Sequence, residues 1–179
     1  GLKPIAQKKD IQLVCEIDER VPTDLIGDST KVDQLVMNFI SNAIKFTSFG
    51  EVRLKVSCKL IAAEKVELHF VVKDTGVGIT QDDLAQLFEP FYQVDDSMSR
   101  EHVGSGLGLA ISKSMVESLG GSVKASSTVG VGSEFVFTLI HYLPTETYMT
   151  EFSPKLVEEP IGTPNMALPE ASTSQKSIL

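Results

Sequence analysis

The segment NFISNAIKFT, residues 38–47, lies in a stretch whose apolar residues recur every three or four positions. That spacing predicts a helix over residues 31–46 with one buried face. Asp28 and Ser29 precede it as suitable N-cap residues, and Ser48-Phe49-Gly50 ends it. The apolar positions of the predicted helix are Val32, Leu35, Val36, Phe39, Ile40 and Ala43.

A second stripe on the same predicted helix is polar. Asn38, Asn42 and Lys45 are four and three residues apart, so they share one side of the helix and are displaced from its apolar face. An amide oxygen is a hard, neutral ligand for Mg²⁺, and an ammonium can neutralise a phosphate oxygen. The stripe therefore suits a metal–phosphate group. A solvated helix face is the alternative, and the stripe alone leaves it open.

Alternation of apolar and polar residues predicts strands on both sides of this helix. The segments concerned are residues 11–18, 51–58, 66–73, about 122–127 and 133–141. Two more helices are expected, a short one at residues 81–87 and a long one at 107–119 that ends at Gly120-Gly121. The long helix carries an apolar series with one residue per turn, namely Leu107, Ile111, Met115 and Leu119. Residues 92–105 are polar and contain glycine, which predicts a mobile loop.

Three motifs outside the first helix could face a ligand. DTGVG at residues 74–78 follows a strand, so its carboxylate could accept a hydrogen bond from an amine such as that of adenine, although D-x-G is also a common turn. LFEPF at 87–91 could anchor one end of the mobile loop or pack in the core. GSGLGL at 104–109 opens a helix, where backbone N–H groups and the helix dipole favour an anion. Arg100, just upstream, could reach a terminal phosphate.

In order along the chain, NFISNAIKFT (38–47), DTGVGI (74–79), LFEPFYQVDDS (87–97) and GSGLGLAIS (104–112) resemble four motifs of histidine kinase catalytic domains. These are the asparagine box, the first glycine box, the phenylalanine box and the second glycine box. The resemblance covers about residues 5–141 and is strongest to hybrid kinases, in which a receiver domain follows a linker. It implies an α/β (α+β) two-layer sandwich of the GHKL ATPase type, a mixed sheet with helices on one face.

The resemblance also implies residue roles. Asn42 would ligate Mg²⁺ with help from Asn38, and Lys45 would contact phosphate. Asp74 would hold the adenine amine, assisted through water by Ser133. Residues 92–105 would form a lid over ATP, in which Gln93 departs from the arginine of many family members. The implied ATP-binding set is Asn38, Asn42, Lys45, Phe46, Asp74, Gly76, Gly78, Ile79, Phe88, Phe91, Arg100, Gly104, Ser105, Gly106, Leu107, Gly108 and Ser133. Asn38, Lys45 and Arg100 are the candidates for positioning the phosphoryl group in the transition state.

The expected activity is that of a protein histidine kinase. Where other GHKL ATPases have a water-activating glutamate, this chain has Asn38, whose amide cannot accept a proton at neutral pH. The acceptor would be a histidine on a separate dimerisation domain of a homodimeric parent protein, and a receiver domain would be a further partner in the phosphorelay. His69, His102 and His141 lie outside any phosphoacceptor motif. The alternative function is a regulatory or scaffold module that binds ATP without transfer.

Composition and length narrow the possible partners and the domain organisation. The 179 residues carry a formal net charge of −8, which disfavours a nucleic-acid partner. Residues 1–143 are expected to form the ATP-binding domain, and residues 144–179, rich in Pro, Ser and Thr, a linker or tail. No apolar run approaches the roughly 20 residues of a membrane span. The chain begins with Gly1, so we expect a piece of a longer protein, with this domain in the cytoplasm whether or not the parent is membrane-anchored.

Overall fold

Five strands form one mixed sheet in the order β1-β2-β3-β5-β4 in a computed structural model that describes residues 1–94 and 106–152. β1 pairs with β2 in parallel, and the other neighbours pair antiparallel. The strands are β1 (Ile11–Ile17), β2 (Gly50–Ala62), β3 (Lys65–Asp74), β4 (Val123–Thr128) and β5 (Gly132–Tyr142). The helices are α1 (Lys3–Lys8), α2 (Ser29–Phe46), α3 (Gln81–Gln86), α4 (Gly108–Ser118) and α5 (Thr145–Thr147), and a π-helical turn follows at Tyr148–Phe152.

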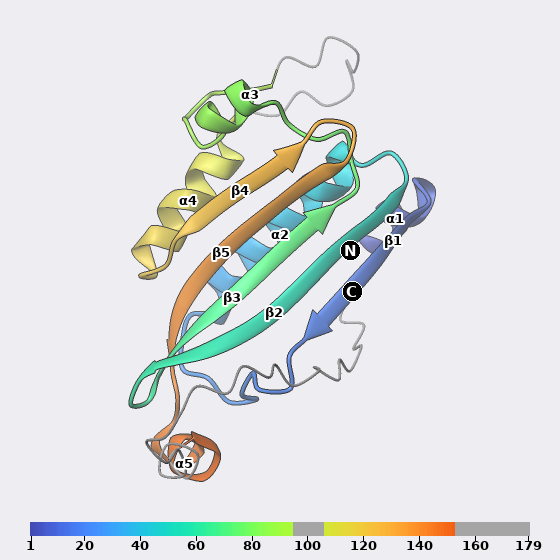
Figure 1. Cartoon of the computed structure of the whole chain (residues 1–179). Coiled ribbons are helices and arrows are strands. Elements are labelled where there is room, and N and C mark those ends of the chain that lie inside the picture. The colour runs from blue at the N-terminus through green and yellow to red at the C-terminus, as the bar shows by residue number, and fades with distance from the viewer. Residues whose placement is uncertain (95–105, 153–179) are drawn as a thin grey trace, which may run out of the picture.

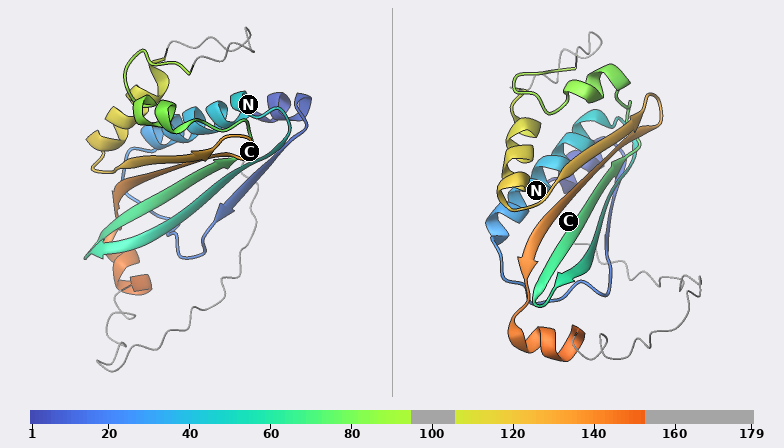
Figure 2. Two further views of the ribbon diagram at one scale, coloured as in Figure 1. Left: turned by 45° about the horizontal axis from the view of Figure 1, so that its top comes forward. Right: turned by 60° about the vertical axis from the view of Figure 1, so that its left-hand side comes forward.

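The helices α1, α2 and α4 lie on one face of the sheet and leave the other face open, and α3 lies beyond the end of β4 (Figures 1 and 2). α2 runs across the middle of the covered face, and α4 lies beside it near the β4 edge. This is the two-layer α/β arrangement expected from the sequence. Among the described residues, no helix is both long and apolar enough to cross a lipid bilayer.

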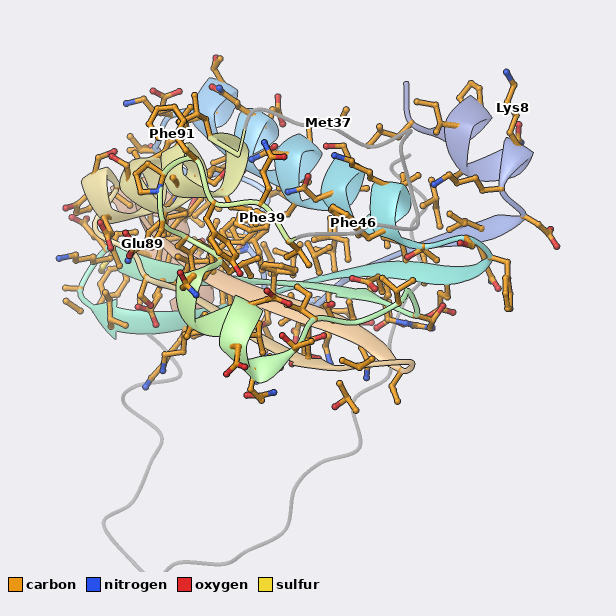
Figure 3. All side chains as sticks on the ribbon, turned by 90° about the horizontal axis from the view of Figure 1, so that it is seen from above. Lys8, Met37, Phe39, Phe46, Glu89 and Phe91 are labelled. Atoms are coloured by element: carbon orange, nitrogen blue, oxygen red, sulfur yellow. The ribbon has the colours of Figure 1, made fainter. Side chains whose placement is uncertain are left out.

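The core lies between α2 and the centre of the sheet. Alternate residues of β3 are buried, as the pleat of a strand requires, and they meet the buried side of α2. Phe137 of β5 stacks on Phe70 of β3 at 4.7 Å between ring centroids and on Phe39 of α2 at 4.8 Å. Figure 3 shows Phe39 pointing from α2 toward the sheet. This stack fixes the height and the rotation of α2 above the sheet.

The expected strands and long helices are confirmed, with their ends shifted by a few residues. The helix α1, the short helix α5 and the turn after it were not expected from the sequence. The expected apolar face of α4 also differs. Ser112 and Val116 are the buried residues of α4, whereas Ile111 is 51% exposed. A series with a step of four residues turns by about 40° per step and therefore winds around the helix instead of following one face.

Candidate functional site

The polar stripe of α2 faces the start of α4. Asn38, Asn42 and Lys45 are all half-buried, as expected for a stripe at the border of the apolar face. The Nδ2 of Asn38 donates to the carbonyl oxygen of Gly108 at 3.1 Å and to the hydroxyl of Ser112. Both contacts use the amide nitrogen, so the Oδ1 of Asn38 keeps its capacity to accept or to ligate. Two of the four motifs thus meet near the middle of α2.

Lys45 lies toward the other end of the same stripe. Its Nζ is 5.1 Å from the centroid of the Phe46 ring, which is 42% exposed. The distance along α2 from Asn38 to Phe46 is about 12 Å, because eight residues each add 1.5 Å. The stripe can therefore line an extended ligand, with the ammonium and one exposed ring near its C-terminal end.

Asp74 ends β3 beside this C-terminal end of α2. Its side chain is buried, and its Oδ1 accepts the backbone N–H of Gly76 at 2.8 Å and that of Ser133 at 3.3 Å. Burial raises the pKa of Asp74, and these two N–H donors oppose that rise. Because a carboxylate offers about four acceptor positions, the second oxygen remains available for an amine on a ligand.

Two glycines let the loop after Asp74 sit between α2 and the β4–β5 turn. A Cβ on Gly76 would lie 2.3 Å from the carbonyl oxygen of Phe46. Gly78 has a φ of 75°, and a Cβ there would lie 2.2 Å from the carbonyl oxygen of Thr128. The N–H of Val77 also donates to the Phe46 carbonyl at 3.3 Å. The loop that carries Asp74 is therefore fixed directly to the end of α2.

A pair of serines supports the same loop from β4 and β5. The Oγ of Ser127 accepts the N–H of Ile79 at 2.8 Å, donates to the carbonyl of Gly132 at 2.8 Å and lies 2.9 Å from the Oγ of Ser133. A hydroxyl has one proton, so Ser133 must be the donor in the last pair. The Oγ of Ser133 is then left as an acceptor near Asp74. Ser127 was missed in the sequence, although its position opposite Ser133 follows from the register of the β4–β5 hairpin.

The two ends of the predicted lid meet. The N–H of Phe91 donates to the carbonyl of Gly106 at 3.0 Å, and Gly106 has a φ of 68° in a position where a Cβ would lie 2.9 Å from the Phe91 carbonyl carbon. Phe88 packs against the core, and the Lys113 ammonium lies 6.0 Å from its ring centroid. Phe91 is 74% exposed, so the core-packing alternative is wrong for this residue, and its backbone makes the contact.

Not every predicted residue can be placed. Arg100, Gly104 and Ser105, with most of the predicted lid, lie outside the described residues. Leu107 is the N-cap residue of α4 and is half-buried. Among the described residues, Asp74 and its loop lie at the C-terminal end of α2, and Asn38 lies beside Gly108 farther along the helix.

Two hollows in the surface lie next to predicted site residues. A groove of about 380 Å³ lies between α2 and α4 and includes Asn38 and Gly108 in its wall. A smaller hollow of about 240 Å³ includes Asp74, Ser127 and Ser133. The groove gives Asn38 accessible space, whereas the smaller hollow is also lined from the open face of the sheet, by Lys73, Ser126 and Glu134.

Comparison with known proteins identifies the family of the chain. The sequence model of a family described as histidine kinase-, DNA gyrase B-, and HSP90-like ATPases matches residues 27–142. The chain belongs to this ATPase family. The expectation drawn from the four motifs is thereby confirmed. The matched range includes β2 to β5 and α2 to α4, whereas α1 and β1 precede it.

Within the family, the chain is similar to histidine kinases. It is 40% identical over 146 residues to hybrid signal transduction histidine kinase B of Dictyostelium discoideum, covering 82% of this chain and 7% of that protein. It is 39% identical over 138 residues to the sensor histidine kinase GacS of Pseudomonas protegens, covering 77% of this chain and 15% of that protein. The chain is thus a histidine kinase-type ATPase domain and spans only a small part of these relatives.

A solved structure shows the same fold. The full-length ShkA structure in complex with AMPPNP matches with a TM-score of 0.67 and 34% identity, covering 80% of this chain and 28% of that one. The expected GHKL-type sandwich is confirmed by this likeness together with the observed mixed sheet.

Proposed function

We propose that this domain binds Mg·ATP along α2 and transfers the γ-phosphoryl group to a histidine on a separate dimerisation domain of its parent protein. The proposal rests on two chemically different groups of residues, a buried carboxylate and an amide stripe, that lie along the same helix, α2. Asp74 with its glycine loop is fixed to the C-terminal end of α2 through the Phe46 carbonyl, and Asn38 contacts Gly108 at the start of α4. Adenine would occupy the Asp74 end and the phosphates the Asn38 end.

The Asp74 end suits adenine by its hydrogen-bonding pattern. A buried carboxylate accepts a hydrogen bond from an exocyclic amine, which adenine presents. Guanine presents an oxygen at the corresponding edge and would leave both acceptors unpaired, at a cost in affinity. The Oγ of Ser133, left as an acceptor, would take a hydrogen bond from a water that bridges to the base.

The Asn38 end suits a triphosphate with its metal. The Oδ1 of Asn38 is available because Nδ2 makes the contacts to α4, and Asn42 follows one turn later on the same stripe. Neutral amide oxygens together with phosphate oxygens fit the preference of Mg²⁺ for hard oxygen ligands. In the part of the chain that is described, no group of three or more His, Cys, Asp or Glu side chains could hold a metal. Bound magnesium would supply charge neutralisation on the phosphates.

The remaining charge on the phosphates falls to Lys45 and to the start of α4. The Lys45 ammonium lies toward the adenine end of the stripe, so it would neutralise an oxygen of the phosphate nearest the adenosine. Backbone N–H groups at the start of α4 favour an anion near Asn38. Catalysis would then consist of positioning and charge stabilisation. Asn38 cannot take a proton from water, which favours transfer over hydrolysis.

The acceptor histidine would come from outside this domain. His141 is buried within β5, so its imidazole is poorly placed for attack on a bound nucleotide. The named relatives are a hybrid histidine kinase and sensor histidine kinases, which supports a dimerisation domain and a receiver domain as partners in a phosphorelay. A homodimeric parent, with this domain in the cytoplasm where ATP is available, is part of the same proposal.

Calorimetric titration with Mg·ATP tests the binding half of the proposal. The unaltered domain should bind Mg·ATP more tightly than Mg·GTP. Asn42→Ala should weaken the binding of Mg·ATP more than it weakens the binding of adenosine, because Asn42 would act only on the metal and the phosphates. An unaltered domain that binds neither nucleotide, or an Asn42→Ala variant with unchanged affinity for Mg·ATP, would contradict the proposal.

A further inference from the structure

The side-chain ammonium of Lys9 caps the C-terminal end of α2 with its three N–H groups. Its Nζ donates to the carbonyl oxygens of Ile44 and Lys45 at 3.0 Å and of Thr47 at 3.3 Å. An ammonium has three N–H donors, so all three are used. The last carbonyls of a helix have no partner within the helix, and a cation there also interacts favourably with the helix dipole. Lys9 is thus a three-point cap from a different segment of the chain.

The same helix end holds the loop that carries Asp74. The carbonyl between those capped by Lys9, that of Phe46, accepts the N–H of Val77. The Gly76 N–H then donates to the Asp74 carboxylate. Four consecutive carbonyls of α2 and its cap residue, at positions 44 to 47, are therefore shared between Lys9 and the adenine loop. A shift of this helix end would move the loop with it.

The position of Lys9 is itself fixed. Lys9 is the C-cap residue of α1. Its backbone N–H donates to the carbonyl of Ala6, and the N–H of the next residue, Asp10, donates to that of Gln7. Ala6 is buried in the core and secures α1 beside β1. The side chain of Lys9 is half-buried, whereas the neighbouring Lys8 is exposed and points away from the domain (Figure 3).

We propose that Lys9 is a positioning residue for the adenine end of the site, acting through the Phe46 carbonyl and the loop of Gly76 and Val77. The inference rests on the proposed function, because it assigns that end to adenine. Loss of the cap would let the end of α2 and the loop shift together, so that Asp74 meets the base poorly. The phosphate end would be spared, because Asn38 is held by its contacts with α4, about two turns away.

Lys9→Met tests the inference, and Lys8→Met is the matched control. Both variants lose one positive charge from α1 or its cap, so the long-range effect on an anionic nucleotide is the same. Lys9→Met should bind Mg·ATP and Mg·ADP about tenfold more weakly than Lys8→Met and should lose part of the preference for ATP over GTP. Lys9→Arg, which keeps a charged donor with several N–H groups, should recover both. A loss of stability alone would leave the preference for ATP over GTP unchanged.

The possible results separate the inference from the proposed function. If the unaltered domain binds Mg·ATP and Lys9→Met binds it as Lys8→Met does, with the same preference over GTP, the inference is overturned and the proposed function stands. If the unaltered domain does not bind Mg·ATP, both fall. Should Lys9→Met unfold, Lys9→Gln allows the same comparison, because its shorter, uncharged side chain has two N–H donors and cannot satisfy the three carbonyls that Lys9 caps. Unchanged affinity and unchanged nucleotide preference in a folded Lys9→Gln would then overturn the inference.

Discussion

Replacing Asp74 by asparagine should change affinity and stability in opposite directions. Two backbone N–H groups, from Gly76 and Ser133, donate to one oxygen of the side chain. The asparagine carbonyl would keep these two bonds, and its NH₂ group would then face the adenine amine. A donor opposite a donor in a buried site costs about 1–3 kcal/mol, which corresponds to about 5- to 150-fold weaker binding of Mg·ATP.

Stability should not fall with this substitution. Burial raises the pKa of Asp74, so the ionised carboxyl is less favourable in the folded domain than in the unfolded chain. The stability that this group contributes is therefore complete below its unfolded pKa, near 3.9, and is lost as the pH rises through the higher folded pKa. Asp74→Asn has no such loss. Near neutral pH the variant should unfold at the same or a higher urea concentration than the unaltered domain.

Calorimetry with Mg·ATP and urea denaturation between pH 4 and 7 measure the two effects. Asp24→Asn is the control, because it makes the same chemical change at an exposed position and removes the same charge. Asp24→Asn should leave affinity within about twofold, since its charge is screened by solvent. A folded Asp74→Asn with the affinity of Asp24→Asn would refute the adenine assignment. A variant that loses both affinity and stability would refute the argument that burial of the charge is costly.

Two further substitutions probe the loop and the surface. Gly78→Ala should lower the free energy of unfolding more than Gly130→Ala does, as measured by urea denaturation. Both glycines have a φ near 76°, but only at position 78 would a Cβ meet a backbone carbonyl, at 2.2 Å. Equal losses of stability would show that backbone strain alone decides. Hydrogen bonds and charge from Arg20 hold the pKa of Asp18 at about 2. Asp18→Asn should therefore lower the free energy of unfolding by about 1 kcal/mol or less at pH 7, and this difference should disappear as the pH falls through 2. A difference that persists at pH 2 would contradict the ion pair as its cause.

Much of the fold was predictable because each pattern reports a local property. The period of α2 and the alternation along β2 and β3 follow directly from which side chains face the core. The stripe of Asn38, Asn42 and Lys45 was equally readable, because helical geometry alone puts the three residues on one side. The contact of Asn38 with Gly108 needed the family resemblance, since 70 residues separate the two.

The parts that were missed depend on tertiary contacts. Lys9 carries no local signal, because its carbonyl partners lie 35 to 38 residues away and any lysine near a helix end looks the same in the sequence. The carbonyl of Phe46 fixes the loop that carries Asp74, and a backbone contact of this kind cannot be read from the sequence. On α4 the exposure of Ile111 could not be read from spacing alone, because the neighbouring helix α2 decides which side is covered.

Phosphoryl transfer is the most direct test of the proposed function. The domain should be incubated with γ-labelled ATP and Mg²⁺, alone and together with the dimerisation domain of its parent protein. The account predicts no label on the isolated domain and acid-labile, base-stable label on the dimerisation domain. Transfer should be slow, because an encounter in solution replaces a tethered one. Acid-labile label on the isolated domain, or release of phosphate without an acceptor, would contradict the central claim that this domain positions ATP for a histidine supplied from outside.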